Sequence, residues 1–96
     1  MRTEKLIVKF VSKNFEVKIK DILSTERKRR LFFARCAISI LLLELGRTHT
    51  DVGNTINRDH ATVTYYKQQH PLLMQQSEYY KDRFNECLND LADIYR

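Results

Sequence analysis

The stretch THTDVGNTINRDHATVTYYKQQH, residues 48–70, decides the fold because it contains two helical patterns joined by a short turn. Thr48 and Asp51 have the spacing of a capping box, in which each side chain bonds the backbone of the other residue. This pair predicts a helix that begins next to Thr48 and turns Val52 and Ile56 toward the interior.

A second helix is expected directly after the turn. Asn57 can adopt the left-handed backbone conformation that ends a helix, and Asp59 can cap the next helix through its carboxylate. We expect this helix over about residues 60–70, where Pro71 kinks or ends it. Helix, short turn and helix in this order predict a helix-turn-helix.

Apolar residues recur at helical spacing through the rest of the chain. They predict further helices over about residues 4–13, 19–23, 27–45 and 77–95. The third of these is apolar nearly all round from residue 31 to 45, which is typical of a helix at the centre of a bundle. Ser24 or Thr25 can cap it, and Gly46 can end it. The predicted fold class is a small all-α bundle of about five or six helices that contains the helix-turn-helix.

The size and composition are those of one soluble domain. The chain has 96 residues, so we expect a single domain over residues 1–96. Hydrophobic residues make up 43% and charged residues 30%, which is typical of a globular protein. Cys36 and Cys87 lie in apolar segments without metal-ligand spacing, and we expect both to be buried and reduced in the cytoplasm. No signal peptide or membrane span is predicted, since the apolar window 31–45 is too short.

Positive charge is concentrated near the beginning of the chain. Residues 1–35 contain 11 Lys and Arg against 4 Asp and Glu, a balance of +7. The run ERKRR, residues 26–30, places cations where a helix dipole disfavours them, which favours contact with phosphates or a minor groove. The residues concerned are Arg27, Lys28, Arg29 and Arg30. The alternative for such a basic surface is a solvated face that binds nothing.

The first turn of the second predicted helix suits the reading of base edges. The carboxylate of Asp59 can accept a hydrogen bond from cytosine, and Thr62 can bond or touch a base edge. Carbon atoms of His60 and Ala61 can touch a thymine methyl group. The expected partner is therefore double-stranded DNA.

Catalytic and metal-binding alternatives have less support. His49, His60 and His70 are about ten residues apart, without the spacing of metal ligands. The pair Asp59–His60 lacks a positioned nucleophile and a glycine-rich oxyanion turn. We therefore expect no enzyme activity, no metal, no cofactor and no small-molecule substrate.

Four segments make the chain resemble a known family. They are RDHATV (58–63), ARCAISILLLEL (34–45), DVGNTI (51–56) and FVSKNFEVKIKDILS (10–24). They are similar to the signature, central helix, first motif helix and opening helices of the C-terminal DNA-binding domain of the bacterial replication initiator DnaA. The resemblance extends over roughly residues 4–92.

This resemblance implies sequence-specific binding at an origin or operator site similar to a DnaA box, in replication initiation or its regulation. Arg29 matches an arginine that enters the minor groove, and residues 59–62 fall on the major-groove readers. Phosphate contacts are implied for Arg35, Thr48, His49, Thr50 and Arg58, the last with a partly structural role. A cytoplasmic, nucleoid-associated protein follows from the resemblance.

The chain also departs from the family pattern. Ala61 replaces a Ser or Thr, Cys36 replaces a Gln, and Asn57 stands where the family usually has two glycines. No phosphate-binding loop of the G-x-x-x-x-G-K-[ST] type occurs in these 96 residues, so the sequence predicts no ATPase domain here.

Two alternatives to specific DNA binding stay open. One is non-specific DNA binding through phosphates alone. The other is a protein-interaction module, in which the helix over 77–95 docks a partner or forms a weak homo-oligomer through its stripe of Tyr80, Phe84, Cys87, Leu91 and Ile94. Such a stripe more often packs within its own domain. Tyr65, Tyr66, Tyr79 and Tyr80 could stack on single-stranded bases, but their spacing is more typical of the edge of a core.

Overall fold

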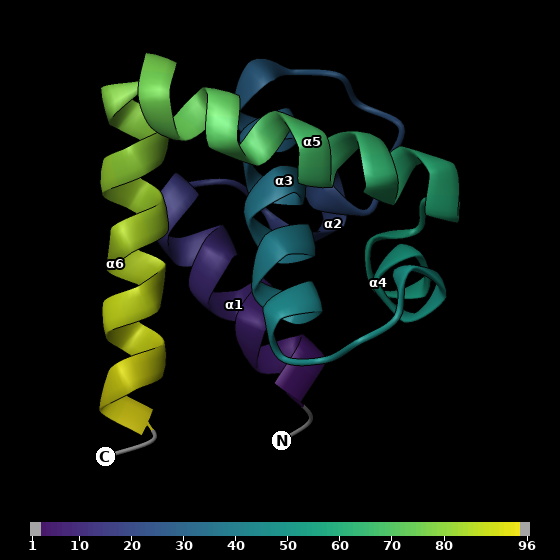
Figure 1. Ribbon diagram of the computed structural model, residues 1–96, viewed down its shortest axis with the longest axis horizontal. Helices are drawn as coiled ribbons and strands as arrows, with labels where there is room; N and C mark the ends of the chain where they lie inside the picture. Colours follow the sequence, from purple (N-terminus) through teal and green to yellow (C-terminus); the bar gives the residue numbers. More distant parts are fainter. Residues whose placement is uncertain (1–2, 95–96) are drawn as a thin grey trace.

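The computed structural model describes residues 3–94, and this part of the chain folds into six α-helices without strands (Figure 1). The helices are α1 (Thr3–Phe15), α2 (Ile19–Ile22), α3 (Arg29–Glu44), α4 (His49–Ile56), α5 (His60–Gln76) and α6 (Glu78–Ile94). The predicted all-α bundle with a helix-turn-helix, formed by α4 and α5, is confirmed.

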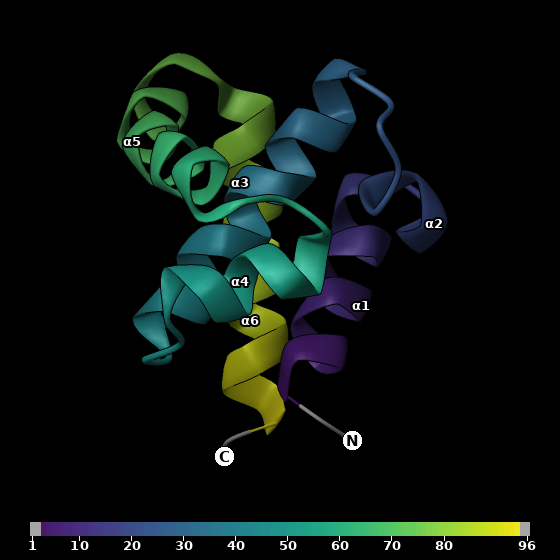
Figure 2. The ribbon, with the colours of Figure 1, turned by 90° about the vertical axis from the view of Figure 1, so that its right-hand side faces the viewer.

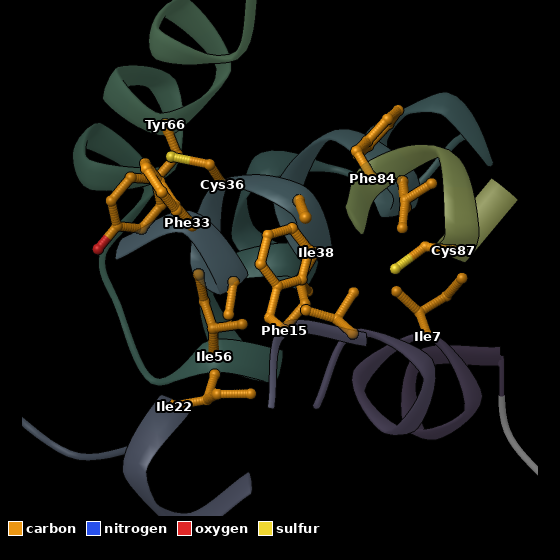
Figure 3. Packing of buried hydrophobic residues seen from close by; sticks show 14 of the residues in the cluster. Ile7, Phe15, Ile22, Phe33, Cys36, Ile38, Ile56, Tyr66, Phe84 and Cys87 are labelled. Carbon is orange, nitrogen blue, oxygen red and sulfur yellow. The ribbon is translucent and has the colours of Figure 1, made fainter. Parts of the chain in front are cut away.

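Helix α3 lies at the centre of the bundle, as its apolar surface predicts. It contacts α1, α2, α4 and α5, and 10 of its 16 residues are buried. Figure 3 shows side chains from all six helices pointing into the common interior around α3. A helix without a polar face is stable in water only in such a position, because every side of it must be covered.

The path from α3 into α4 is fixed by backbone and capping hydrogen bonds. Gly46 has a φ of 87° and donates to the carbonyl of Leu43, while Arg47 donates to the carbonyl of Leu42. This is a Schellman motif, which requires the left-handed conformation that glycine adopts most easily. Thr48 and Asp51 then form the predicted capping box at the start of α4.

The predicted cap of α3 is wrong. The helix begins at Arg29, and neither Ser24 nor Thr25 caps it; Lys28 precedes it without a side-chain cap. The hydroxyl of Ser24 donates to the carbonyl of Asp21 and accepts from the backbone of Glu26, so it closes a turn inside the connection instead. The segment between α2 and α3 (residues 23–28) is called the basic loop below.

The predicted end of α5 is also wrong. Pro71 lies inside α5, which continues to Gln76. Proline removes one helical hydrogen bond at a cost of about 3 kcal/mol. Leu73 beyond it is buried and Met74 packs against the core, and this burial offsets the lost bond.

The stripe on α6 packs within the domain. Tyr80, Phe84 and Cys87 are buried where α6 lies against α1 and α5, whereas Ile94 at the end of the stripe is 47% exposed. A homo-oligomer through α6 stays a prediction. Cys87, like Cys36, is a buried free thiol, as expected.

A buried arginine holds the basic loop against the bundle. Arg35 is only 3% exposed, and its Nε donates to the carbonyl oxygen of Ile22 at 2.9 Å. Its Nη1 donates to Glu26 at 2.7 Å, and its Nη2 donates to Asp21 and Ser24 at 2.9 Å each. Burial, and secondarily the charge of a neighbouring arginine, lowers the pKa of Arg35. Four backbone carbonyls of the loop and α2 therefore accept hydrogen bonds from one guanidinium.

Replacing Arg35 should destabilise the fold. We expect Arg35→Met to lower the free energy of unfolding by about 3 kcal/mol, because four carbonyls lose a charged donor and one of these hydrogen bonds, to Ile22, is buried. Urea denaturation followed by circular dichroism measures this change. Arg27→Met, at an exposed position of the same loop, should change the stability by less than about 0.5 kcal/mol. Equal stabilities for the two variants would contradict the role given to Arg35.

Candidate nucleic-acid interface

Three elements share one side of the molecule. In Figure 1 the basic loop, α4 and the start of α5 lie at the right, and Figure 2 turns this side toward the viewer. The predicted DNA-contacting residues come from these elements and from the start of α3, which follows the loop. The basic loop is thereby brought onto one surface with segments that lie more than 20 positions further along the sequence.

The turn of the helix-turn-helix has the predicted conformation. Asn57 is left-handed, with φ 60° and ψ 48°, and ends α4. Asp59 caps α5, and its Oδ1 accepts a hydrogen bond of 2.8 Å from the backbone of Thr62. This hydrogen bond holds the pKa of Asp59 below its ordinary value, so the carboxylate is charged at neutral pH. The cap fixes the first turn of α5 before any ligand arrives.

The predicted base-reading residues lie together on that first turn. Asp59, His60 and Ala61 are exposed, and Thr62 is half-buried. Val63, the next residue, is fully buried and fixes the rotation of the helix about its own axis. The turn therefore presents a carboxylate, an imidazole, a methyl group and a hydroxyl to a ligand.

Arg58 connects the turn to the basic loop. Its Nη1 donates to the carbonyl of Asn57 at 2.9 Å, and its Nη2 donates to the carbonyl of Ser24, which also accepts from Arg35. The side chain of Asn57 adds a hydrogen bond of 3.2 Å to the carbonyl of Leu23. The helix-turn-helix and the basic loop are therefore held at a fixed separation.

This geometry changes the expected role of two arginines. The resemblance implies phosphate contact for Arg35 and Arg58, yet the guanidinium groups of both donate to backbone carbonyls, and Arg35 is buried. We assign Arg35 to positioning the loop and propose no phosphate contact for it. Arg58 is half-buried and has the structural part of its expected role.

The basic loop and the start of α3 expose four consecutive cations. Arg27, Lys28, Arg29 and Arg30 all lie at the surface. The guanidinium of Arg29 lies 4.8 Å from the ring centroid of Phe33, and that of Arg30 lies 5.7 Å from the ring centroid of Tyr79. The first turn of α3 contains no acidic residue. Cations and the positive end of a helix dipole here attract the same anions.

The remaining phosphate candidates lie at the start of α4. Thr48 and Thr50 are exposed, and His49 is half-buried. The Oγ1 of Thr48 accepts from the backbone of Asp51 in the capping box, so its hydroxyl proton remains available for an anion. Backbone N–H groups of the first turn point the same way as in other anion-binding helix starts.

A cleft between the basic loop and α5 was not anticipated from the sequence. It has a volume of about 660 Å³, and its lining includes Thr25, Thr62 and Tyr65. Tyr65 lies at the edge of the core, as the sequence predicts, because its ring contacts Phe32 and buried Tyr66 while its side chain is 49% exposed. The spacing of three residues between Thr62 and Tyr65 was the available signal, because it places both on one helix face.

Residues 3–94 contain neither a candidate metal-binding cluster nor a candidate membrane span. No group of three or more His, Cys, Asp or Glu side chains there could hold a metal ion. None of the helices in this range is long and apolar enough to cross a membrane.

Gly53 permits the close packing of the helix-turn-helix turn. A Cβ atom at this position would overlap the backbone carbonyl oxygen of Arg58, whose N–H donates to the carbonyl of Gly53 at 2.8 Å. We expect Gly53→Ala to destabilise the protein by about 2 kcal/mol, since the clash outweighs the better helix propensity of alanine. Thermal unfolding measures this loss of stability. Asn54→Ala, at the exposed neighbouring position, should be close to neutral, and a neutral Gly53→Ala would show that the turn can move.

Comparison with known proteins agrees with this geometry. A family model described as the bacterial dnaA protein helix-turn-helix matches residues 5–69, from α1 into α5. A search of curated proteins finds no match. The matched segment contains the basic loop, α4, the turn and α5 as far as residue 69, and it covers more than half of the 96 residues. The chain belongs to the family of bacterial DnaA helix-turn-helix DNA-binding domains.

Proposed function

We propose that this chain binds double-stranded DNA sequence-specifically, at an origin or operator site similar to a DnaA box. One observation supports this most: a capped, exposed helix start and a basic loop lie on one face and are joined through Arg58 and Asn57. Two elements at a fixed separation can contact two adjacent grooves of one duplex.

The start of α5 would read the major groove. Its first turn is exposed, and an α-helix fits the width of this groove. Thr62 and Asp59 offer hydrogen-bonding groups to base edges, whereas His60 and Ala61 offer carbon atoms to thymine methyl groups. Thr48, His49 and Thr50 at the start of α4 would bind phosphates and set the orientation.

Arg29 would enter the minor groove next to the bases read by α5. Its guanidinium rests on the ring of Phe33, and such an exposed cation–π contact is worth about 0.5–1 kcal/mol. When the guanidinium leaves the ring and enters a narrow A·T-rich minor groove, it exchanges that contact for attraction to the stronger negative potential of the groove. Arg27, Lys28 and Arg30 would bind the flanking phosphates.

The biological role would be replication initiation or its regulation, in the cytoplasm and on the nucleoid. Family membership and the basic surface support this proposal. The part of this role that we propose for the chain is the binding of a DNA site, which needs no catalytic step. We therefore propose a binding module and not an enzyme.

Fluorescence anisotropy with a DnaA-box duplex and a scrambled duplex, at low and near-physiological salt, tests the proposal. We expect a preference for the box that persists as salt rises, since base contacts are less sensitive to salt than phosphate contacts. Binding that is salt-sensitive and equal for both duplexes would leave non-specific DNA binding. Absence of binding to either would point to a protein partner.

Substitutions on the first turn of α5 should change specificity at single positions. We expect His60→Ala and Thr62→Ala to lower discrimination at particular base pairs by about 1–3 kcal/mol each. This loss of discrimination is measured from the affinities for a set of box duplexes, each with one base pair altered. Gln68→Ala, at an exposed position further along α5, is the control. Equal losses of affinity on every duplex would contradict the reading of bases by this turn.

Arg29→Ala should weaken binding and reduce the preference for a narrow minor groove. We expect a larger loss on duplexes with an A·T tract than on duplexes with G·C pairs at the same place, because the tract has the more negative potential. Lys81→Ala also removes one positive charge, but from α6, far along the chain, and it serves as the control. If both variants lost affinity equally on both duplexes, Arg29 would act only through its charge.

A further inference from the structure

The cleft of about 660 Å³ lies between the two elements that are proposed to contact DNA. Thr25 and Arg27 of the basic loop contribute to its lining from one side. Thr62 and Tyr65 of α5 contribute from the other side. The cleft therefore lies at the junction of the loop and the recognition helix.

An aromatic cluster gives the α5 side of the cleft a fixed shape. The rings of Phe32, Tyr65 and Tyr66 contact one another, with centroid distances of 6.0 to 6.2 Å. Tyr66 is buried, whereas Tyr65 is 49% exposed. Within residues 3–94 the hydroxyl of Tyr65 makes no hydrogen bond, so this half-exposed side chain can offer a donor in the lining of the cleft.

The lining of the cleft is positively charged. It includes Arg27, Arg35 and Arg58, and no Asp or Glu among the described residues contributes to it. The hollow between α1, α2 and α4 differs, because Glu4 and Asp51 contribute to its lining. A positive cleft with apolar rings and a free hydroxyl matches a ligand that has both phosphate and sugar groups.

The duplex itself supplies such a ligand at this place. The major and minor grooves are separated by one sugar–phosphate strand, so a protein that contacts both adjacent grooves must straddle that strand. We propose that this cleft binds the intervening strand, with the hydroxyl of Tyr65 donating to a phosphate oxygen and its ring packing on a deoxyribose. This inference rests on the proposed function, and it adds Tyr65 to the residues that position the DNA.

Tyr65→Phe tests the hydroxyl and leaves the ring in place. We expect the affinity for a box duplex to fall by about tenfold, which is typical for the loss of one hydrogen bond to a charged group. Tyr79→Phe is the matched control, because its hydroxyl makes a hydrogen bond of 3.4 Å to Phe15 on α1 and lies outside the cleft lining. Circular dichroism melting confirms that both variants are folded.

The phosphate is located by a series of duplexes, each with one neutral methylphosphonate in the strand between the two groove contacts. At one or two adjacent positions the methylphosphonate should lower the affinity of the wild-type protein. The same methylphosphonate should lower the affinity of Tyr65→Phe very little, because this variant already lacks the hydroxyl that bonds the phosphate. Such non-additivity shows that the hydroxyl and that phosphate interact. Tyr79→Phe should follow the wild type at every position.

The outcomes separate this inference from the function on which it rests. If the wild type prefers the box but Tyr65→Phe binds as tightly as Tyr79→Phe, the strand-binding role of Tyr65 is wrong and the proposed function stands. Additive losses at every methylphosphonate position would likewise exclude this role of Tyr65. If the wild type binds no duplex, both proposals fail.

Discussion

The guanidinium of Arg35 makes the contacts on which the side proposed to bind DNA depends. It donates to the carbonyls of Asp21, Ile22, Ser24 and Glu26, and so gathers the end of α2 and the basic loop around one charge. A loop without regular structure leaves backbone carbonyls that need donors when they are buried. An arginine supplies five donors in a rigid fork, whereas lysine supplies three on a point charge, so this position depends on arginine.

The carbonyl of Ser24 joins this loop to the helix-turn-helix, because it accepts from both Arg35 and Arg58. Two like charges near one carbonyl repel each other, and the charge of Arg58 helps to lower the pKa of Arg35. An anion bound nearby relieves this repulsion. The phosphate that we propose for the adjacent cleft would therefore be favoured by the same pair that fixes the loop.

The features that could be predicted from the sequence are those that depend on interactions between residues close together in the chain. The capping box of Thr48 and Asp51, the left-handed Asn57 and the cap at Asp59 each involve residues no more than four positions apart. The wrong expectations concern long-range contacts. Ser24 fails to cap α3 because Arg35, 11 positions away, holds the loop, and α5 passes Pro71 because Leu73 is buried in the core. The cleft at Tyr65 likewise requires a loop and a helix that only tertiary packing brings together.

A loop that is ordered before binding lowers the conformational entropy that is lost when DNA binds. Fixing the backbone of one residue costs roughly 1–2 kcal/mol of conformational entropy, and here folding has already fixed the loop through Arg35, Arg58 and Asn57. Binding energy is then not spent on ordering the loop, as in other preorganised interfaces. The fixed separation also constrains the target. One base pair moves a site by about 3.4 Å along the duplex. The rigid pair of readers that we propose would therefore accept one spacing between its minor-groove and major-groove sequences and reject sites in which that spacing is changed.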